Sequence, residues 1–213
     1  MSGPGFGELE AWRDRLRRRG EIWLARAGPV SSPPGAGRFS ADPLFLAWRR
    51  AGGAEPAPEN PAPDLALWRA LLDGAWPIDV DPRAGRAPIA PRAAYRTIEA
   101  WTEADLACIH ALWWLGRTRG RPELIARSLD AADWHIEHIQ PDNATNRPWA
   151  IHVFLDLWRA RDVLEGRLHA ETLLHNADVA AGSKVEGPGA VIAHIAADGA
   201  DALDAMLNDG AGV

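Results

Sequence analysis

The chain has 213 residues, a formal net charge of −6 and one cysteine, Cys108. The length allows one large domain or two small ones, the lone cysteine excludes an internal disulfide, and the negative charge argues against nucleic-acid binding. No run approaches the ~18 apolar residues that span a bilayer, and the first residues lack the apolar segment of a secretory signal. We therefore expect a soluble, cytoplasmic protein with no membrane segment.

The first third of the chain is rich in proline and glycine. The stretches GPVSSPPGAGRFS (28–40) and GGAEPAPENPAPD (52–64) cannot continue a helix, so they isolate a short helical piece over 42–52. We expect residues 1–63 to form a loop-rich helical arm and residues 64–213 to form an all-α core domain.

Charge is spread unevenly along the chain. Lys184 is the only lysine among 23 basic residues, and one N-terminal helix is expected to carry a cluster of arginines: Arg13, Arg15, Arg17, Arg18 and Arg19. Residues 165–213, in contrast, are mainly acidic among their charged positions. The cluster is typical of a solvated helix face, and the alternative is a surface for an acidic partner.

Helical signals dominate after residue 91. We expect helices in four segments with a strong apolar pattern: 102–120, 122–140, 148–160 and 161–182. The alanine- and aspartate-rich segment 188–208 is expected to form one or two helices. The predicted N-caps are Thr102 for the first helix and Asn146 or Thr145 for the third. Pro122 suits the first turn of the second helix, and Pro141 ends it. Only 77–80 is compatible with a strand, because no segment alternates apolar and polar residues.

Two helix pairs echo each other, starting at His110 and at His152. Each pair consists of a very apolar helix, an arginine-containing turn and an amphipathic helix. This pattern predicts an all-α fold of stacked antiparallel helical hairpins. Eleven tryptophans accompany a single tyrosine, and they indicate either a core of large side chains or an aromatic-lined cleft. Over residues 92–180 this pattern resembles the α/α-barrel enzymes that act on carbohydrates or isoprenoids, although a complete barrel needs more hairpins.

The stretch WHIEHIQPDNATNRPW (134–149) and the start of the next helix hold most of the candidate site residues. His135 and His138 share one helix face beside the apolar stripe, so we expect both to be partly buried. Asp156 follows His152 by one turn, and we expect it to hydrogen-bond that histidine and set its tautomer. The complete set of ligand-binding candidates is His110, His135, His138, Asp142, Asn143, Asn146, Trp149, His152 and Asp156.

Several interpretations of this stretch stay open. A pocket without metal would use the histidines as acids, bases or donors, oriented by Asp142, Asn143 and Asn146. A divalent metal would be bound by His135, His138, His152 and Asp142. The structural alternative is a loop whose amides satisfy helix ends, beside histidines that are satisfied in the core.

The residues Glu137 to Pro141 also resemble the first element of HNH endonucleases. The resemblance implies a histidine that activates water, at His138, but Asn146 follows too soon and the surroundings are helical. The chain as a whole is thus predicted to be either a protein with a small-molecule or catalytic pocket at 134–152, or a helical scaffold that binds a protein partner. The sequence identifies no cofactor and leaves enzymatic activity undecided.

Overall fold

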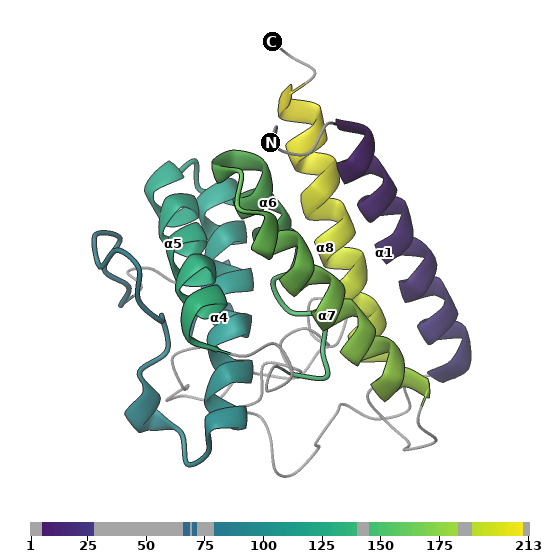
Figure 1. The fold of residues 1–213 in the computed structure, drawn as a ribbon, viewed down its shortest axis with the longest axis horizontal. Helices are drawn as coiled ribbons and strands as arrows, with labels where there is room; N and C mark the ends of the chain where they lie inside the picture. The colour runs from purple at the N-terminus through teal and green to yellow at the C-terminus, as the bar shows by residue number, and fades with distance from the viewer. Residues whose placement is uncertain are drawn as a thin grey trace. The chain divides into compact units, whose positions relative to one another are not determined.

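The described part of the chain is built from α-helices (Figure 1). The computed structural model describes residues 6–27, 66–68, 70–71, 79–139, 145–182 and 189–210. Within these residues no strand is formed, and Asp79 and Val80, from the segment compatible with a strand, are irregular. The predicted all-α class is therefore confirmed. No helix in the described ranges combines the length and the apolar character needed to cross a membrane.

The chain forms two compact units, which are described separately below. The first unit combines Met1–Val30 with Thr145–Val213, and the second unit is Ser31–Ala144. The predicted division at residue 63 and the short helix over 42–52 lie outside the described residues, so both stay predictions.

The second unit is centred on an antiparallel hairpin of α4 (Ile98–Thr118) and α5 (Pro122–His138). Pro122 stands in the first turn of α5 as predicted. The predicted cap of α4 is wrong: Thr97 accepts a hydrogen bond from Ala100 N at 3.2 Å, and Thr102 is buried inside the helix. The sequence offers two threonines there, and the helix extends to the earlier one.

Glycine lets the two helices of this hairpin approach closely. A Cβ at Gly116 would lie 2.8 Å from the backbone nitrogen of Ile125, so α5 can begin close against the end of α4 only because residue 116 has no side chain. Gly120 turns the chain with φ +60. Before α4, the segment 79–97 runs over the hairpin and contains one short 3₁₀ turn, η1 (Arg92–Ala94).

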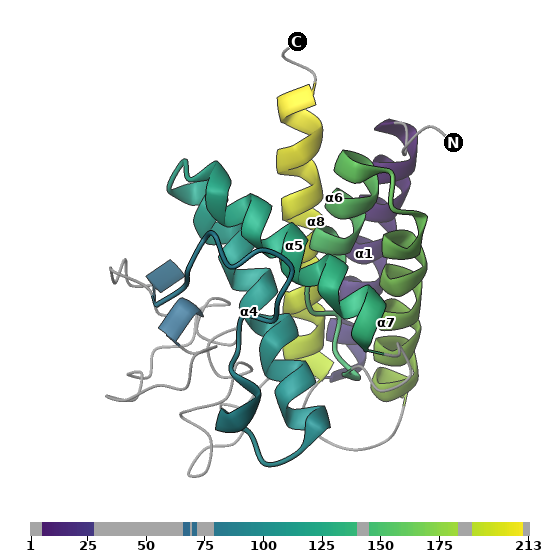
Figure 2. The same ribbon diagram turned by 60° about the vertical axis from the view of Figure 1, so that its left-hand side comes forward.

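The first unit contains four helices: α1 (Phe6–Ala27), α6 (Ile151–Arg161), α7 (Leu164–Gly182) and α8 (Gly189–Gly210). The C-terminal segment, predicted as one or two helices, is thus a single helix from Gly189 on. α1 and α8 pack side by side and antiparallel, since Arg13 pairs with Asp204 while Gly20 approaches Ala193 (Figure 1). α7 lies along α1, where Arg15 pairs with Glu171 (Figure 2).

α6 and α7 form a second antiparallel hairpin. Only Asp162 and Val163 separate the helices, and Asp162 makes the turn with φ 56. The predicted cap of α6 is wrong, because Ala150 holds the N-cap position in the left-handed conformation without a side-chain cap. Thr145 instead accepts a hydrogen bond from Arg147 N at 3.1 Å, within the irregular segment that leads to the helix.

Most tryptophans belong to the cores of the two units. Seven are buried: Trp12, Trp23, Trp68, Trp101, Trp113, Trp149 and Trp158. Cys108 is also buried and forms no disulfide. Among the described residues, the interpretation of the tryptophans as core side chains therefore holds better than the interpretation of an open aromatic cleft.

Candidate functional site

His135, the first histidine of the candidate stretch, is a buried structural residue of the second unit. Its Nε2 lies 2.6 Å from Oδ2 of Asp105, and neither side chain is exposed. The ring stacks on Trp101 with 6.1 Å between centroids. Since Nδ1 has no hydrogen-bond partner among the described residues, the Nε2–H tautomer, which donates to Asp105, satisfies the pair best.

Asp105 links this histidine to the segment that covers the hairpin. Its Oδ1 accepts hydrogen bonds from the backbone nitrogens of Ile89 and Ala90, at 2.7 and 2.5 Å. A carboxylate with these three donors stays satisfied although it is buried. The pair thus fastens residues 89–90 to α4 and α5.

Two further side chains hold the same segment. Arg127 donates to the carbonyl oxygens of Ala87 and Pro88, both at 2.9 Å, and the indole of Trp101 donates to the carbonyl oxygen of Ala90 at 2.8 Å. Burial lowers the pKa of Arg127, and the nearby carboxylates, Asp105 first, oppose that shift. We call Trp101, Asp105, Arg127 and His135 the hairpin clamp, and its contacts are those of a structural anchor.

His138 lies in a different environment from the one expected. Its side chain is 47% exposed, so the prediction that it is partly buried beside the apolar stripe is wrong. The ring stacks on Trp134 with 4.4 Å between centroids, and Nδ1 lies 2.9 Å from the carbonyl oxygen of Trp134. His138 is the last residue of α5, and its ring covers Trp134 one turn earlier instead of entering the core.

The remaining candidates of the second unit are only partly described. His110 is buried in α4, with its ring 5.4 Å from the ring of Trp68. Glu137 is exposed and pairs with Arg86 at 2.9 Å. The pKa of Arg86 is raised, first by its hydrogen bond to Glu137. Asp142 and Asn143 lie outside the described residues.

The other candidates belong to the first unit. Trp149 and His152 are fully buried, whereas Asn146 is exposed. The sequence predicts His152 as the partner of Asp156, but the structure pairs this buried carboxylate with Arg159, whose Nη2 lies 2.7 Å away. The arginine is three residues further along α6, and its longer side chain carries a permanent charge that compensates the carboxylate better than a neutral histidine.

The candidates are therefore divided between the two units. His110, His135 and His138 belong to the second unit, while Asn146, Trp149, His152 and Asp156 belong to the first unit, so their convergence stays a prediction. Within the described ranges no group of three or more histidine, cysteine, aspartate or glutamate side chains is placed to hold a metal ion. Glu137 and His138 end a helix, which does not fit the strand pair of the HNH resemblance.

A cleft lies within the first unit. The tryptophan content raised an aromatic-lined cleft as one alternative, but the sequence did not locate it. The cleft has a volume of about 270 Å³, and its lining comes from three helices: Glu8, Ala11, Trp12 and Arg15 of α1, Trp158 of α6, and Arg167 and Glu171 of α7. The guanidinium of Arg15 lies over the Trp12 ring at 4.9 Å, and that of Arg167 lies over the Trp158 ring at 5.4 Å. The three-residue spacing of Trp12 and Arg15 was the available signal for the first pair.

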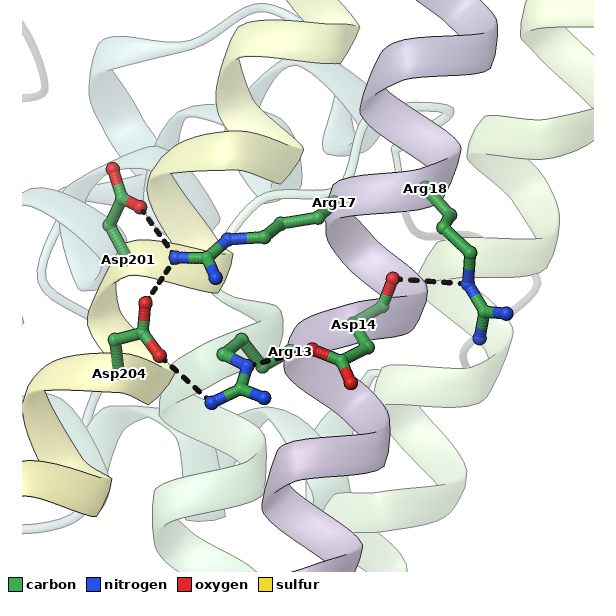
Figure 3. A network of polar contacts seen from close by, with 6 residues as sticks. All are labelled: Arg13, Asp14, Arg17, Arg18, Asp201 and Asp204. Atoms are coloured by element: carbon green, nitrogen blue, oxygen red, sulfur yellow. Dashed lines mark hydrogen bonds and ion pairs between the residues drawn. The ribbon is translucent and has the colours of Figure 1, made fainter.

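Four of the five arginines of the α1 cluster pair with acidic side chains of α7 and α8, and Arg18 donates to the carbonyl oxygen of Asp14. Arg13 and Arg17 both pair with Asp204 of α8, and Arg17 also approaches Asp201 at 3.5 Å (Figure 3). On the other side of α1, Arg15 pairs with Glu171 and Arg19 with Asp178, at 2.6 and 3.3 Å. The acidic partner considered for this cluster is thus supplied in part by the chain's own C-terminal helices.

Comparison of the chain with protein-family models, with curated proteins and with solved structures finds no match. Any function must therefore be argued from the chain's own residues.

Proposed function

We propose that this protein is an interaction module that binds a helical segment of another protein along α1 and α7. The observation that carries the proposal is the distribution of exposed aliphatic side chains. Six large hydrophobic residues are exposed in the described part of the chain, and five of them belong to α1 and α7: Ile22, Leu24, Leu164, Leu168 and Val179. Single exposed residues are ordinary on a protein surface, but a gathered set marks an interaction site.

Helical spacing places four of these residues toward one surface. Leu164, Leu168 and Val179 fall on one side of α7, together with the ion-paired Glu171. Ile22 follows Arg15 by two turns and so shares the side of α1 that Arg15 turns toward α7. We call Ile22, Leu164, Leu168 and Val179 the α1–α7 face. Leu24 lies on the other side of α1.

The α1–α7 face suits an amphipathic helix. Leu168 and Val179 are the most exposed of its residues, at 59% and 62%, and they are three turns apart. The ion pairs Arg15–Glu171 and Arg19–Asp178 bridge the two helices beside this apolar stripe. A partner helix with apolar residues at matching spacing buries the stripe and leaves its polar side in solvent.

The test is a displayed library of amphipathic helical peptides, selected on the wild-type protein and titrated by fluorescence anisotropy. We expect Leu168→Asp and Val179→Asp each to weaken binding by about tenfold, because each places a charge in an apolar contact. Leu24→Asp is the matched control, since Leu24 is also exposed, at 45%, but lies off the face, and it should change affinity by less than about twofold.

Two outcomes would contradict the proposal. One is a library that yields no peptide whose binding depends on Leu168 or Val179. The other is a Leu24→Asp variant that weakens binding as much as Leu168→Asp. Sedimentation measures the oligomeric state of the wild-type protein and of Leu168→Asp in the absence of peptide. If the substitution converts a dimer to a monomer, the face binds a second copy of the chain, and the partner-helix proposal fails.

A ligand or metal site at hairpin 134–152 is the second proposal. It is supported by the exposed His138, which stacks on Trp134 and is free of the hairpin clamp. Zinc titration followed by histidine NMR signals tests it, with His175→Ala as the control for an exposed histidine elsewhere. Binding that survives His138→Ala, or no change of the His138 signals, would reject the site.

A further inference from the structure

We propose that the cleft of the first unit binds a small zwitterion with an apolar body, such as a free amino acid with an aromatic side chain. The proposal goes beyond the interaction module, because no residue of the α1–α7 face lines the cleft. The volume of about 270 Å³ lies below the ~300 Å³ at which sites for drug-sized ligands begin, so the ligand is small.

One cation and one anion of the cleft already form an ion pair with each other. Arg15 Nη1 lies 2.6 Å from Glu171 Oε2, and the Arg15 guanidinium also covers the Trp12 ring. A ligand that competed for either charge would have to break this ion pair. Neither residue is therefore the main recognition group.

The cleft also contains one cation and one anion that have no oppositely charged partner among the described residues. Arg167 is exposed and lies over the Trp158 ring, and no carboxylate partner is found for it among the described residues. Glu8 is exposed on the α1 side of the cleft, and within the same residues its carboxylate has no cationic partner. A ligand with a carboxylate and an ammonium group can pair with both side chains, whereas a ligand with a single charge pairs with one.

The apolar part of the lining suits the apolar body of the ligand. Besides the charged side chains, the lining contains Ala11 and two largely buried indoles, Trp12 and Trp158. Arg167 is held in place by its contact with Trp158, so its planar fork is already oriented before a carboxylate arrives. Apolar walls beside oriented charges select an amino acid with an apolar side chain over a purely polar zwitterion.

Three probes with the same indole ring test the charge requirement: tryptophan is zwitterionic, indole-3-propionate is an anion and tryptamine is a cation. Binding is followed by NMR through the indole N–H signals of Trp12 and Trp158, each assigned with a Trp→Phe variant. We expect tryptophan to bind about fivefold more tightly than either singly charged probe, which is the effect of one partly exposed ion pair.

Two variants should shift the relative affinities of the anionic and the cationic probe in opposite directions. Arg167→Ala should weaken tryptophan and indole-3-propionate by about fivefold and leave tryptamine unchanged, whereas Glu8→Gln should weaken tryptophan and tryptamine and leave indole-3-propionate unchanged. Arg26→Ala is the matched control, since Arg26 is an exposed arginine of α1 outside the cleft, and it should leave all three probes unchanged.

The proposal is overturned if no probe shifts the Trp12 or Trp158 signals, if the three probes bind equally, or if Arg26→Ala acts like Arg167→Ala. Far-UV circular dichroism of each variant shows whether the helices are retained, and the crossed response of two probes to one variant cannot come from misfolding. The α1–α7 face is tested with different variants, so either proposal can fail without the other.

Discussion

Replacement of Asp105 by alanine should release residues 89–90 from the hairpin of the second unit. In the native protein the carboxylate accepts hydrogen bonds from Ile89 N, Ala90 N and His135 Nε2, at 2.7, 2.5 and 2.6 Å. The alanine variant leaves three donors without their acceptor in a buried site. Each such donor costs about 1 to 3 kcal/mol, which gives about 3 to 9 kcal/mol in all.

The lower end of that range is the better estimate. Removal of a buried carboxylate also removes the cost of its desolvation, which offsets part of the loss. A local destabilisation of about 3 kcal/mol corresponds to an increase of about hundredfold in the population of the opened segment. Asp105→Asn should have a smaller effect of about 1 to 2 kcal/mol, because the amide oxygen still accepts from the two backbone nitrogens.

Hydrogen exchange at the amides of Ile89 and Ala90 measures this directly by NMR. We expect both amides to exchange about a hundredfold faster in Asp105→Ala, with an intermediate rate in Asp105→Asn. Glu137→Ala is the control, because it removes only an exposed ion pair with Arg86 from the same hairpin. If both amides in Asp105→Ala exchanged within about threefold of the wild-type rate, the assignment of Asp105 as the anchor would be refuted.

Three further predictions concern the first unit. Gly166→Ala should destabilise this unit by about 1 to 3 kcal/mol, because a Cβ there would lie 2.5 Å from the carbonyl oxygen of Phe154. Gly7→Ala, where a Cβ would meet nothing within 4 Å, should instead stabilise α1. Urea unfolding of both variants measures the two changes in stability, and equal effects would contradict the prediction. Asp204→Arg should lower the thermal unfolding midpoint, since it places a third cation beside Arg13 and Arg17. The decrease of the midpoint should become smaller as salt is added, because salt screens the repulsion. A decrease that does not depend on salt would argue against an electrostatic cause. Burial lowers the pKa of His194, so the unfolded state binds a proton more readily than the folded state, and the free energy of unfolding declines as the pH falls below ~6.5. His194→Gln should flatten this part of the curve of stability against pH. An unchanged curve would show that other groups cause the decline.

Local patterns predicted the helices better than their ends. The apolar spacing of α4, α5, α6 and α7 was sufficient to identify each helix, and Pro122 marked a correct start. The caps of α4 and α6 were predicted wrongly, because Thr97 and Thr102 are both plausible caps and because Ala150 adopts a conformation that its residue type does not signal. The free energy that separates neighbouring cap positions is only about 1 kcal/mol, so packing decides between them.

The candidate site was predicted less well than the fold, for a different reason. Helical spacing relates residues three or four apart, but the partner of His135 is Asp105, thirty residues earlier on the facing helix. Spacing also placed His138 beside the apolar stripe, although its side chain, at the last residue of α5, is 47% exposed. The cleft joins Trp12 to Trp158 and Arg167, which no local pattern relates.

By itself the sequence determined that the described chain is helical and where its hairpins turn, because apolar periodicity, proline and glycine act over a few residues. Only the tertiary structure decided which charges meet: Arg13 and Arg17 reach Asp204, and Asp105 reaches His135 and the backbone of residues 89–90. The physical reason is that a buried or paired charge takes its partner from whichever helix packs against it. That choice depends on the packing of whole helices, and short-range sequence patterns do not contain it.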